Sequence, residues 1–507
     1  MKQYIYRHQI IHFLLIVLIS ISFLSCKKEA LDGESTSVES NLDTDDTAIS
    51  LEGDLQISDF VWQGLNQWYY WQEEVEALAD SKLTDTKTYA QYINDNPDPD
   101  VFFESLKHPD DRFSWIQDDY LELENSLQGI YATNGVEFGL TYACQDCEEV
   151  VGYVKYILVG SDADGKNIQR GDFFTGVNNT TLTVNNYRSL LFGEDLTYTL
   201  NMAEVQDGAL QENGIVVELT KVENFETNPI QISKTINTAA GKVGYLMYNQ
   251  FVANKSNDLN QVFAEFKSEG ILDFVLDLRY NGGGSVRNCI ELSSMITGQF
   301  TDDVFVVQEW NKKLNTYLEE RYGSETLIDR FTDVLSDNEK INSLGLNKIY
   351  ILTTGDSASA SELLINGLSP YIDVIQIGEQ TVGKNVGSIT LYDYLDNSEE
   401  QTRNPDHRYA MQPIVLKYAN KDGFADYNNG LTPSEEIEED IRNYGTLGEI
   451  DEPYLAMALS LISGTGKSTP AKAEWNKSLL FSDPFISKKQ RMFLDQDLPF
   501  LPKANEK

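Results

Sequence analysis

Residues 355–388 read GDSASASELLINGLSPYIDVIQIGEQTVGKNVGS. They follow an apolar run at Lys348–Thr353, which predicts a buried strand. The apolar spacing within Ser359–Leu368 predicts a helix, and Val374–Ile377 predicts the next strand. Strands that alternate with helices pack as an α/β layer, and functional sites are usually built from the loops at the strand ends. This part of the chain therefore predicts an α/β core.

Three serines lie where the first strand gives way to the helix. Ser359 falls at the transition itself, where free backbone N–H groups and the helix dipole face the loop. A serine in that place has its hydroxyl near donors that can stabilise an oxyanion. The competing interpretation is that Ser357, Ser359 and Ser361 only cap the helix, and this stretch alone favours neither.

A second loop has the composition of a backbone donor site. Residues 277–284 read DLRYNGGG and end another predicted buried strand, Asp273–Leu278. Consecutive glycines can adopt positive φ and present N–H groups to a ligand. No Gly-Lys-Ser or Gly-Lys-Thr follows, which excludes a phosphate-binding loop of the common nucleotide-binding type.

A serine nucleophile needs a base, and histidine is scarce in this chain. Two of the four histidines lie near the N-terminus and two in predicted loops: His8, His12, His108 and His407. Lys384 is the better candidate, because it lies in a glycine-flanked loop after Val374–Ile377. A lysine acts as a base only when its pKa is lowered, most simply by burial. The alternative for a single lysine is a solvated surface charge.

Together these residues resemble the carboxyl-terminal processing, or tail-specific, serine peptidases. That family has a Ser-Lys dyad on a crotonase/ClpP-like α/β core, usually with an inserted PDZ domain. Its S-A-S-A-S-E motif is matched by Ser357–Glu362, which implies that Ser359 is the nucleophile, and its lysine by Lys384, 25 residues later. Its D-L-R-x-N-x-G-G motif is matched by Asp277–Gly284. The resemblance implies an oxyanion hole made by the amides of Gly284 and Ala360.

Other segments extend the resemblance over about residues 130–440. Gly244–Leu246 is similar to the strand that opens the family's core, and Gly430–Pro433 to a late turn. The strand-rich residues 127–225 would then be a PDZ-like domain that binds the C-terminal tail of a polypeptide substrate by strand addition. Within it, Phe138, Gly139 and Leu140 resemble the carboxylate-binding loop, and Arg170–Asp172 a turn common in such domains.

The chain departs from the family pattern around the lysine. Relatives often carry a glutamine four residues after the lysine, and here Ser388 is the candidate for positioning it. Asn385 replaces a glycine, and Pro370 stands where some relatives have an acidic residue. These departures keep open the alternative of a catalytically weak, peptide-binding lipoprotein that retains the peptidase fold.

The N-terminus predicts export. Lys2 and Arg7 precede an apolar run, Ile10–Leu24, that is short for a membrane span and typical of a signal peptide. Ser25-Cys26 resembles a bacterial lipoprotein cleavage box, so Cys26 would become the lipidated N-terminus. An ordinary signal peptide or an uncleaved anchor is the alternative. The expected location is the cell envelope, on a bacterial (outer) membrane, facing the periplasm or the cell surface.

The predicted architecture is therefore an α/β, crotonase/ClpP-like core with a PDZ-like β-rich domain and a small N-terminal helical module. An aromatic cluster near Trp62–Trp71 is expected to pack against a neighbouring domain rather than to form a ligand cage. The expected segments are a signal peptide (1–25), an acidic linker (26–54), the helical module (55–126), the PDZ-like domain (127–225), the peptidase core (226–465) and a C-terminal tail (466–507).

The amino-acid composition limits the kinds of molecule that the protein is expected to bind. The 507 residues carry a net charge of −41, which makes nucleic acid and anionic lipid surfaces poor partners and favours solubility. We expect polypeptide substrates, contact with a membrane only through the lipid, and no metal or cofactor; the oligomeric state is not predicted. Cys144 and Cys147 form a single C-x-x-C between two predicted strands, which favours a hairpin turn, with or without a local disulfide, over a redox or metal site.

Overall fold

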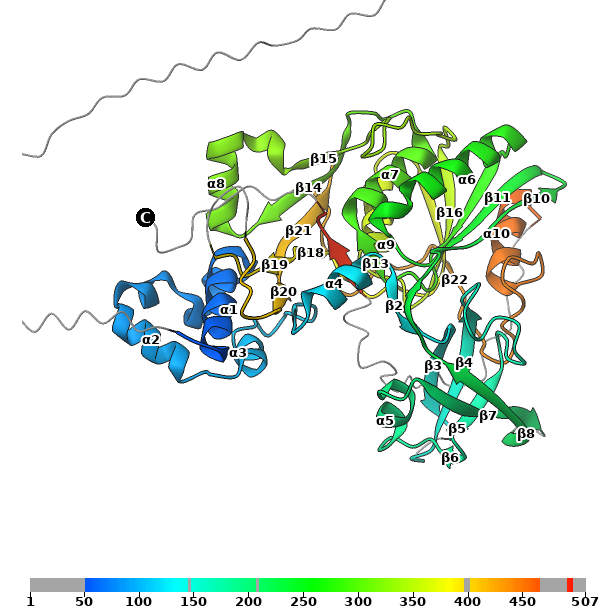
Figure 1. Ribbon diagram of the computed structural model, residues 1–507. Coiled ribbons are helices and arrows are strands. Elements are labelled where there is room, and N and C mark those ends of the chain that lie inside the picture. The colour runs from blue at the N-terminus through cyan, green and yellow to red at the C-terminus, as the bar shows by residue number, and fades with distance from the viewer. Residues whose placement is uncertain (1–50, 145–146, 207–208, 396–401, 466–489, 496–507) are drawn as a thin grey trace, which may run out of the picture. The chain divides into compact units, whose positions relative to one another are not determined.

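The computed structural model describes residues 51–144, 147–206, 209–395, 402–465 and 490–495 (Figure 1). The predicted signal peptide, Cys26, most of the acidic linker and most of the C-terminal tail lie outside the described residues. No helix in the described ranges is both long and apolar enough to cross a membrane.

The N-terminal module is built from short helices. Three 3-10 turns, Gln72–Glu74, Glu76–Leu78 and Asp80–Thr84, connect the first two of its helices, α1 (Asp54–Trp68), α2 (Thr86–Asn94), α3 (Pro99–Ser105) and α4 (Tyr120–Leu127). Asp85 caps α2 and Asp98 caps α3 with their side chains, as short acidic side chains commonly do at helix starts. Trp62 is fully buried and Trp68 packs against Trp310 of the core, which confirms that the aromatic cluster packs.

The β-rich domain has an antiparallel sheet in the order β3-β4-β5-β7-β8, with β3 at one edge. Its elements are β2 (Ile130–Thr133), β3 (Val136–Tyr142), β4 (Val150–Ile157), β5 (Phe173–Val177), β6 (Thr180–Thr181), α5 (Tyr187–Phe192), β7 (Thr197–Gln206), β8 (Ala209–Thr220) and β9 (Val222–Glu226). Leu140, Val154, Phe174 and Leu200 belong to a core of this domain's own. The structure thus has strands throughout the segment that the sequence marked as strand-rich, residues 127–225.

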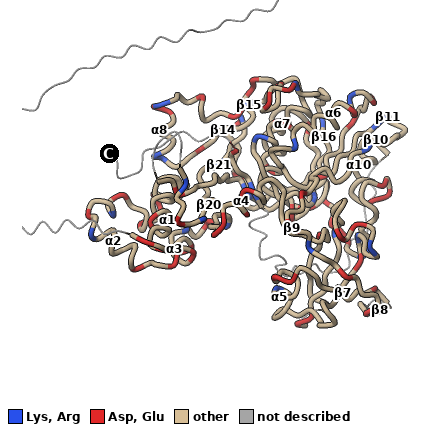
Figure 2. The backbone as a smooth tube through the Cα atoms, viewed as in Figure 1, with Lys and Arg blue, Asp and Glu red and all other residues tan. Residues whose placement is uncertain are grey.

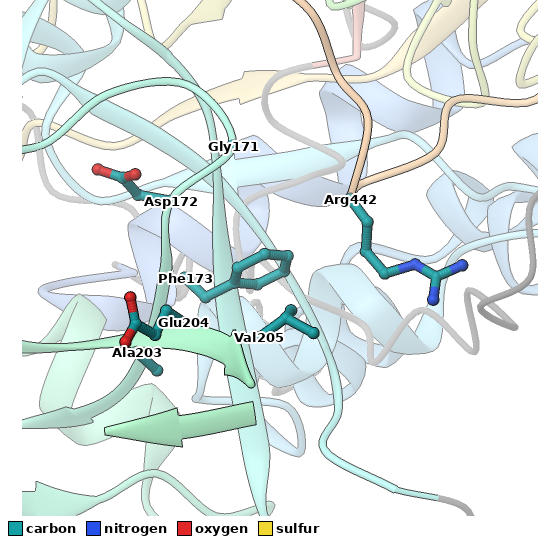
Figure 3. A pocket seen from close by; sticks show the side chains of 7 residues that line it. All are labelled: Gly171, Asp172, Phe173, Ala203, Glu204, Val205 and Arg442. Atoms are coloured by element: carbon teal, nitrogen blue, oxygen red, sulfur yellow. The ribbon is translucent and has the colours of Figure 1, made fainter. Parts of the chain in front are cut away.

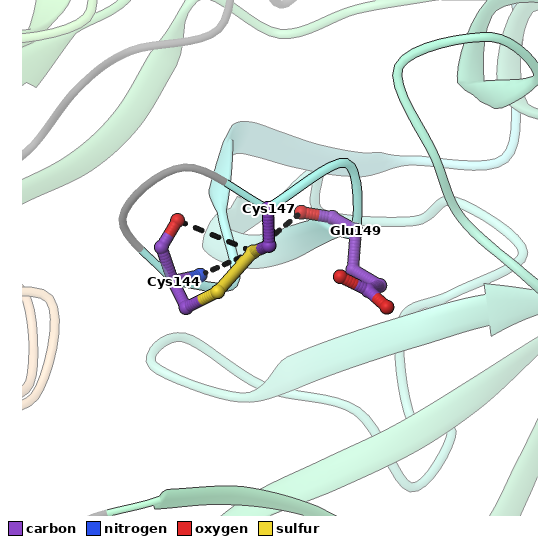
Figure 4. The surroundings of a disulfide bond; sticks show 3 residues. All are labelled: Cys144, Cys147 and Glu149. Atoms are coloured by element: carbon purple, nitrogen blue, oxygen red, sulfur yellow. Dashed lines mark hydrogen bonds between the residues drawn. A yellow bond between two sulfur atoms is a disulfide. The ribbon is translucent and has the colours of Figure 1, made fainter.

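A disulfide joins Cys144 and Cys147 in the turn between β3 and β4 (Figure 4). The expected hairpin turn is therefore present, closed by the local disulfide that the spacing allowed.

The main core sheet is mostly parallel, in the order β10-β11-β12-β16-β17-β22. Its strands are β10 (Ile230–Thr238), β11 (Gly241–Tyr248), β12 (Asp273–Asp277), β16 (Lys348–Thr353), β17 (Asp373–Gly378) and β22 (Glu435–Glu436), and its helices are α6 (Ser256–Glu269), α7 (Val286–Thr297), α9 (Ala360–Leu368) and α10 (Pro453–Ser463).

Both faces of this sheet are covered. Leu246 and Tyr248 of β11 belong to the apolar cluster that includes Phe263 of α6, whereas the intervening Met247 packs in the cluster of Tyr454 on α10. Successive strand side chains point to opposite faces, so helices on both sides bury a continuous apolar strand. Figure 1 shows α6 and α7 on one side of the sheet and α10 on the other.

A second sheet, in the order β13-β23-β18-β21-β14-β15, lies next to the loops that leave the main sheet. Its strands are β13 (Gly283–Ser285), β14 (Val304–Trp310), β15 (Ile328–Arg330), β18 (Val386–Ser388), β21 (Ile414–Asn420) and β23 (Arg491–Phe493). Between β14 and β15 lie α8 (Lys312–Tyr322) and a 3-10 turn, and β1 (Trp115–Gln117), β20 (Ala410–Gln412) and β19 (Leu391–Tyr392) form a smaller sheet. Strand β23 was not predicted: it belongs to this sheet, although its residues fall in the segment expected to be a tail.

The acidic charge is a general feature of the chain. Figure 2 shows Asp and Glu spread over the helical module, the β-rich domain and the core, with Lys and Arg interspersed. This distribution agrees with a role in solubility rather than in recognition of one basic partner.

Candidate active site

Two loops that leave neighbouring strands of the main sheet are bonded together. Ala358 N donates to Asn281 O at 3.1 Å, Ser357 Oγ to Leu278 O at 2.8 Å, and Ser361 Oγ to Asn281 O at 2.9 Å. The loop after β12 and the loop before α9 therefore form one unit. Two of the three candidate serines serve to hold it.

Ser359 is different from its two neighbours. Its φ is 66° and its ψ −113°, a backbone conformation that costs a non-glycine residue about 1–3 kcal/mol and that clusters at functional sites. The residue is fully buried and is the N-cap of α9, where it forms a capping box with Glu362. Its hydroxyl donates to no acceptor among the described residues, whereas Ser357 and Ser361 donate theirs to backbone carbonyls. Ser359 is thus the one serine of the motif whose O–H group is not held by an acceptor.

Glu362 links the serine to the lysine loop. Its Oε2 accepts hydrogen bonds from Ser359 N (2.7 Å) and Lys384 N (2.8 Å), so these two nitrogens can be no farther apart than the sum, 5.5 Å. Its Oε1 accepts from Gly383 N (2.6 Å) and Thr381 Oγ1 (2.5 Å). Burial raises the pKa of the Glu362 carboxyl, although all four donors act to lower it. The motif match contained Glu362, but sequence reasoning gave it no role.

Lys384 is buried as its predicted role requires. Its side chain is 3% exposed, and Nζ lies 4.8 Å from the ring centre of Phe113 and donates to Gln490 O at 2.7 Å. Burial lowers its pKa to about 7, with the Asp111 carboxylate acting in the opposite direction and Arg491 adding to the lowering. No hydrogen bond joins Lys384 Nζ to Ser359 Oγ in the described part of the chain.

Residues of the helical module contact Lys384 and its loop. These contacts were not predicted from the sequence. Arg112 Nη2 donates to Gly383 O at 2.8 Å, next to Lys384, and Phe113 covers the amine. Asp111 is held by Tyr69 Oη at 2.7 Å. The contacts of Arg112 and Phe113 with the lysine loop join residues 271 positions apart, and no local pattern marks them.

Glycines 283 and 284 let the second loop approach the serine. Their φ values are +104° and +143°. A Cβ on Gly284 would lie 1.9 Å from Phe251 O, and one on Gly283 would lie 2.7 Å from Ser359 Cβ and 2.9 Å from Ala360 N. Gly283 therefore lies against Ser359 and Ala360, and the neighbouring Gly284 packs against Phe251. The oxyanion hole of the Gly284 and Ala360 amides stays a prediction.

Ser388 does not position the lysine, so that prediction is wrong. Its Oγ lies 2.8 Å from Gln412 Oε1 and 3.2 Å from Met492 O. The side chain lies in β18, within hydrogen-bond distance of β20 and β23, and the lysine amine bonds a backbone carbonyl instead. Asn385, a second departure from the family pattern, anchors the loop through Nδ2 to Ala425 O at 2.6 Å.

Phe138, Gly139 and Leu140 form no loop, which corrects a second prediction. They lie within β3 and pair with Val154, Tyr153 and Gly152 of β4. A Cβ on Gly139 would lie 2.2 Å from the Tyr153 ring, so the glycine is needed for strand packing. Phe138 also contacts Phe192 of α5. The peptide-binding candidate is therefore the edge of β3 opposite α5.

Two basic residues connect the β-rich domain to the candidate site. Lys155 of β4 forms an ion pair with Asp356, three residues before Ser359. Arg170, from the predicted turn, donates to Tyr280 Oη at 2.6 Å and to Glu439 Oε1 at 3.0 Å. Both loops of the candidate site thus contact this domain.

A surface pocket of about 390 Å³ lies elsewhere (Figure 3). It lies beside β5 and β7, where Phe173 and Val205 face Arg442. None of the predicted catalytic residues lines it, and we assign it no function.

Comparisons with known proteins agree with this arrangement. The model of peptidase family S41 matches residues 242–422, and that of the peptidase S41 N-terminal domain matches residues 56–115. A protein of Staphylococcus epidermidis described as a "probable CtpA-like serine protease" is 22% identical over 386 residues, which are 75% of this chain and 64% of that protein. A carboxyl-terminal-processing protease of Synechocystis sp. is 21% identical over 330 residues, 63% of this chain and 68% of that protein. The chain spans 64% of the length of the first of these relatives.

A solved structure has the same fold. A Bacteroides fragilis protein assigned to the S41 proteases superimposes with a TM-score of 0.62 at 23% identity, over 80% of this chain and 98% of that one. The predicted fold class, an α/β core with a β-rich domain and an N-terminal helical module, is confirmed.

Proposed function

The chain belongs to peptidase family S41, and from this we propose that it is a serine endopeptidase with a dyad of Ser359 and Lys384. The observation that carries the proposal is a buried serine close to a buried lysine. The backbone of Ser359 is strained, and its hydroxyl donates to no acceptor among the described residues. The lysine's pKa is lowered to about 7, and Glu362 binds the backbone of both residues.

The proposed reaction uses these groups in two steps. Ser359 Oγ attacks the carbonyl carbon of the scissile peptide bond while neutral Lys384 takes its proton, and the amides of Gly284 and Ala360 stabilise the oxyanion. The lysine ammonium then protonates the leaving amine, which leaves an acyl group on Ser359. Water, deprotonated by the same lysine, hydrolyses this ester and frees the serine.

We propose that substrates are polypeptides bound through their C-terminal tails. Strand β3 lies at the edge of its sheet, so it can accept an added strand, as in other domains that bind peptides by strand addition, and its Phe138 contacts Phe192 of α5. Lys155 and Arg170 would transmit the binding of a tail to the site. Lys155 pairs with Asp356 in the loop before Ser359, and Arg170 donates to Tyr280 in the loop after β12.

The proposed location is the bacterial cell envelope, with Cys26 carrying the lipid. The signal-like N-terminus supports export, and so does the Cys144–Cys147 disulfide, since disulfides persist in oxidising compartments. The protein would then contact the membrane only through its lipid and would act on exported proteins.

The pH dependence of cleavage tests the dyad. Only neutral Lys384 can take the serine proton, so kcat/KM for an unfolded polypeptide should rise with pH and level off above an apparent pKa of about 7. The same assay with Ser359→Ala gives the background. A midpoint near the ordinary lysine value, or a profile that is flat between pH 6 and 9, would contradict the assignment of Lys384 as base.

Glu362→Gln tests how the dyad is held. Glutamine keeps one acceptor oxygen and places an NH2 group against N–H donors, so the serine and the lysine should shift relative to each other. A displacement of about 1 Å can cost about 10²-fold in rate, and we expect kcat to fall by that order with little change in KM. Thermal unfolding of the variant separates misfolding from misplacement. A stable variant with the parent's kcat would remove Glu362 from this role.

A further inference from the structure

The chain's own residues 490–495 lie between the two halves of the candidate site. Strand β23 (Arg491–Phe493) pairs in parallel with β13 (Gly283–Ser285), which ends the glycine loop. On its other side it pairs with β18, which begins two residues after Lys384. Figure 1 shows β23 in red beside β13 and β18.

This segment presents backbone carbonyls to the candidate catalytic groups. Gln490 O accepts the hydrogen bond from Lys384 Nζ at 2.7 Å. Arg491 N donates to Gly282 O at 2.8 Å, and the parallel register then directs the Arg491 carbonyl toward the amide of Gly284. A Cβ on Gly283 would lie 2.1 Å from Arg491 O and 2.7 Å from Ser359 Cβ. The sum of these distances, 4.8 Å, is the upper limit between that oxygen and the serine Cβ.

Met492, Leu494 and Asp495 each make a further contact with the groove. Met492 is fully buried, and its carbonyl lies 3.2 Å from Ser388 Oγ. Leu494 N donates to Ser388 O at 3.1 Å. The Asp495 carboxylate accepts from Ser285 Oγ at 2.6 Å.

The Arg491 side chain provides one more anchor: Nη1 donates to Ser126 O at 2.9 Å, beyond the groove. The side chains of 492–494 are buried in succession, and the strand is paired with β13 on one side and with β18 on the other. The segment therefore fills a groove between two strands, and its backbone is bound there as an extended polypeptide is bound by strand addition.

The bound segment is not arranged for cleavage. Lys384 Nζ bonds to Gln490 O, while the Ser359 hydroxyl donates to no acceptor among the described residues. A general base must reach the proton that it removes, either directly or through one water. A segment that occupies the lysine and leaves the serine unactivated behaves as an inhibitor rather than as a substrate.

We propose that the groove between β13 and β18 binds an extended polypeptide parallel to β13, and that residues 490–495 occupy it as an internal pseudosubstrate. The inference rests on the proposed peptidase function. A substrate must displace the segment, and it would place an apolar side chain where Met492 lies and an acidic or polar one where Asp495 lies. A tethered segment competes at an effective concentration of about millimolar, so substrates that are also held elsewhere on the chain would be favoured.

The test uses the full chain with Met492→Asp. A carboxylate is costly to bury at this apolar position, so the segment should leave the groove. We expect kcat/KM for an unfolded polypeptide to rise about tenfold, mainly through a lower KM. Val101→Asp introduces the same carboxylate in place of an apolar side chain at an exposed position on α3 and should stay at the parent's level. If Met492→Asp does not fold, Asp495→Ala removes the bond from Ser285 and should give a smaller rise.

Two readouts do not depend on cleavage. In the Ser359→Ala background, a synthetic peptide QRMFLDQ, the sequence of residues 490–496, should bind the Met492→Asp chain at least tenfold more tightly than the parent chain. Hydrogen exchange at residues 491–495 of the parent should speed up when excess peptide is added. If no variant cleaves anything, the proposed function fails, and these two measurements still decide the inference.

Three results would overturn the inference. One is a folded Met492→Asp chain that neither gains activity nor binds the peptide, because β23 would then be a permanent strand of the sheet. Another is unchanged hydrogen exchange at residues 491–495 in excess peptide. The third is an intact-mass measurement that finds the parent cut between Arg491 and Met492, because the segment would then be a substrate.

Discussion

Replacing Ser359 with alanine is expected to lower kcat/KM for an unfolded polypeptide by about 10⁴-fold or more, because no other group can form the acyl intermediate. Lys384→Ala should cost a similar factor, since the nucleophile would keep its proton. Lys384→Arg should fail equally, because a guanidinium stays charged at every accessible pH. The double variant should lose no more than either single one, as residues that act as a unit are not additive.

Ser361→Ala is the matched control for this experiment. It removes a hydroxyl from the same motif, but that hydroxyl bonds Asn281 O and holds a loop. We expect a loss of stability of about 1 kcal/mol and an activity within about tenfold of the parent. Cleavage at the parent's rate by Ser359→Ala would contradict Ser359 as the nucleophile. A parent chain that cleaves no faster than the background would favour the alternative, a peptide-binding lipoprotein that keeps the peptidase fold.

The second large effect is expected on stability, from Arg279→Met. Arg279 is fully buried and bonds three carboxylates: its Nε lies 2.9 Å from Asp277 Oδ1, and its Nη1 2.7 Å from Glu452 Oε1 and 3.2 Å from Glu439 Oε1. Breaking a buried ion pair by removing one partner costs about 3–5 kcal/mol, because it leaves buried charge uncompensated. In a chain of this size, where the entropy of unfolding is about 1 kcal/mol/K, we expect the Tm to fall by about 3–5 °C.

Arg330→Met is the control for this prediction. Arg330 pairs with Glu325 at the surface, where their side chains are 36% and 75% exposed, and such pairs contribute about 0–1 kcal/mol. Scanning calorimetry of both variants beside the parent measures the difference. An Arg279→Met chain that melts within about 2 °C of the parent would show that the buried network does not stabilise the core.

Arg279→Met should also lower activity. The carbonyl of Arg279 accepts a hydrogen bond from Thr354 Oγ1, in the loop that leads to Ser359. If the loop that contains Arg279 moves, the loop that positions Ser359 is therefore expected to move with it. This explains in physical terms why the charged residue of a D-L-R motif lies so close to a site in which it takes no direct part.

Local patterns predicted the elements that carry the candidate site. The strand at Lys348–Thr353 was predicted with the bounds that β16 has, and the helix predicted from Ser359 begins at Ala360. Alternation of apolar strands with amphipathic helices is a property of neighbouring residues, so the sequence reveals it directly. The same holds for the serine motif and the glycine loop, whose chemistry depends on short spacings.

Contacts between distant segments were not predictable in this way. The clamp made by Glu362, the cover of Phe113 over the lysine and the docking of β23 all depend on how segments meet in space. Two errors have the same origin: Ser388 pairs with Gln412 and Met492 O rather than with the lysine, and Phe138–Leu140 lie within a paired strand.

The residues of the chain thus determine an α/β core, a serine at a helix start, a glycine loop and a lone lysine, because these follow from periodicity and residue type over short distances. The tertiary structure decides which of three serines keeps a free hydroxyl, why the lysine's pKa falls and what occupies the groove. Those properties depend on burial and on hydrogen bonds between segments up to 365 residues apart, which no local spacing encodes.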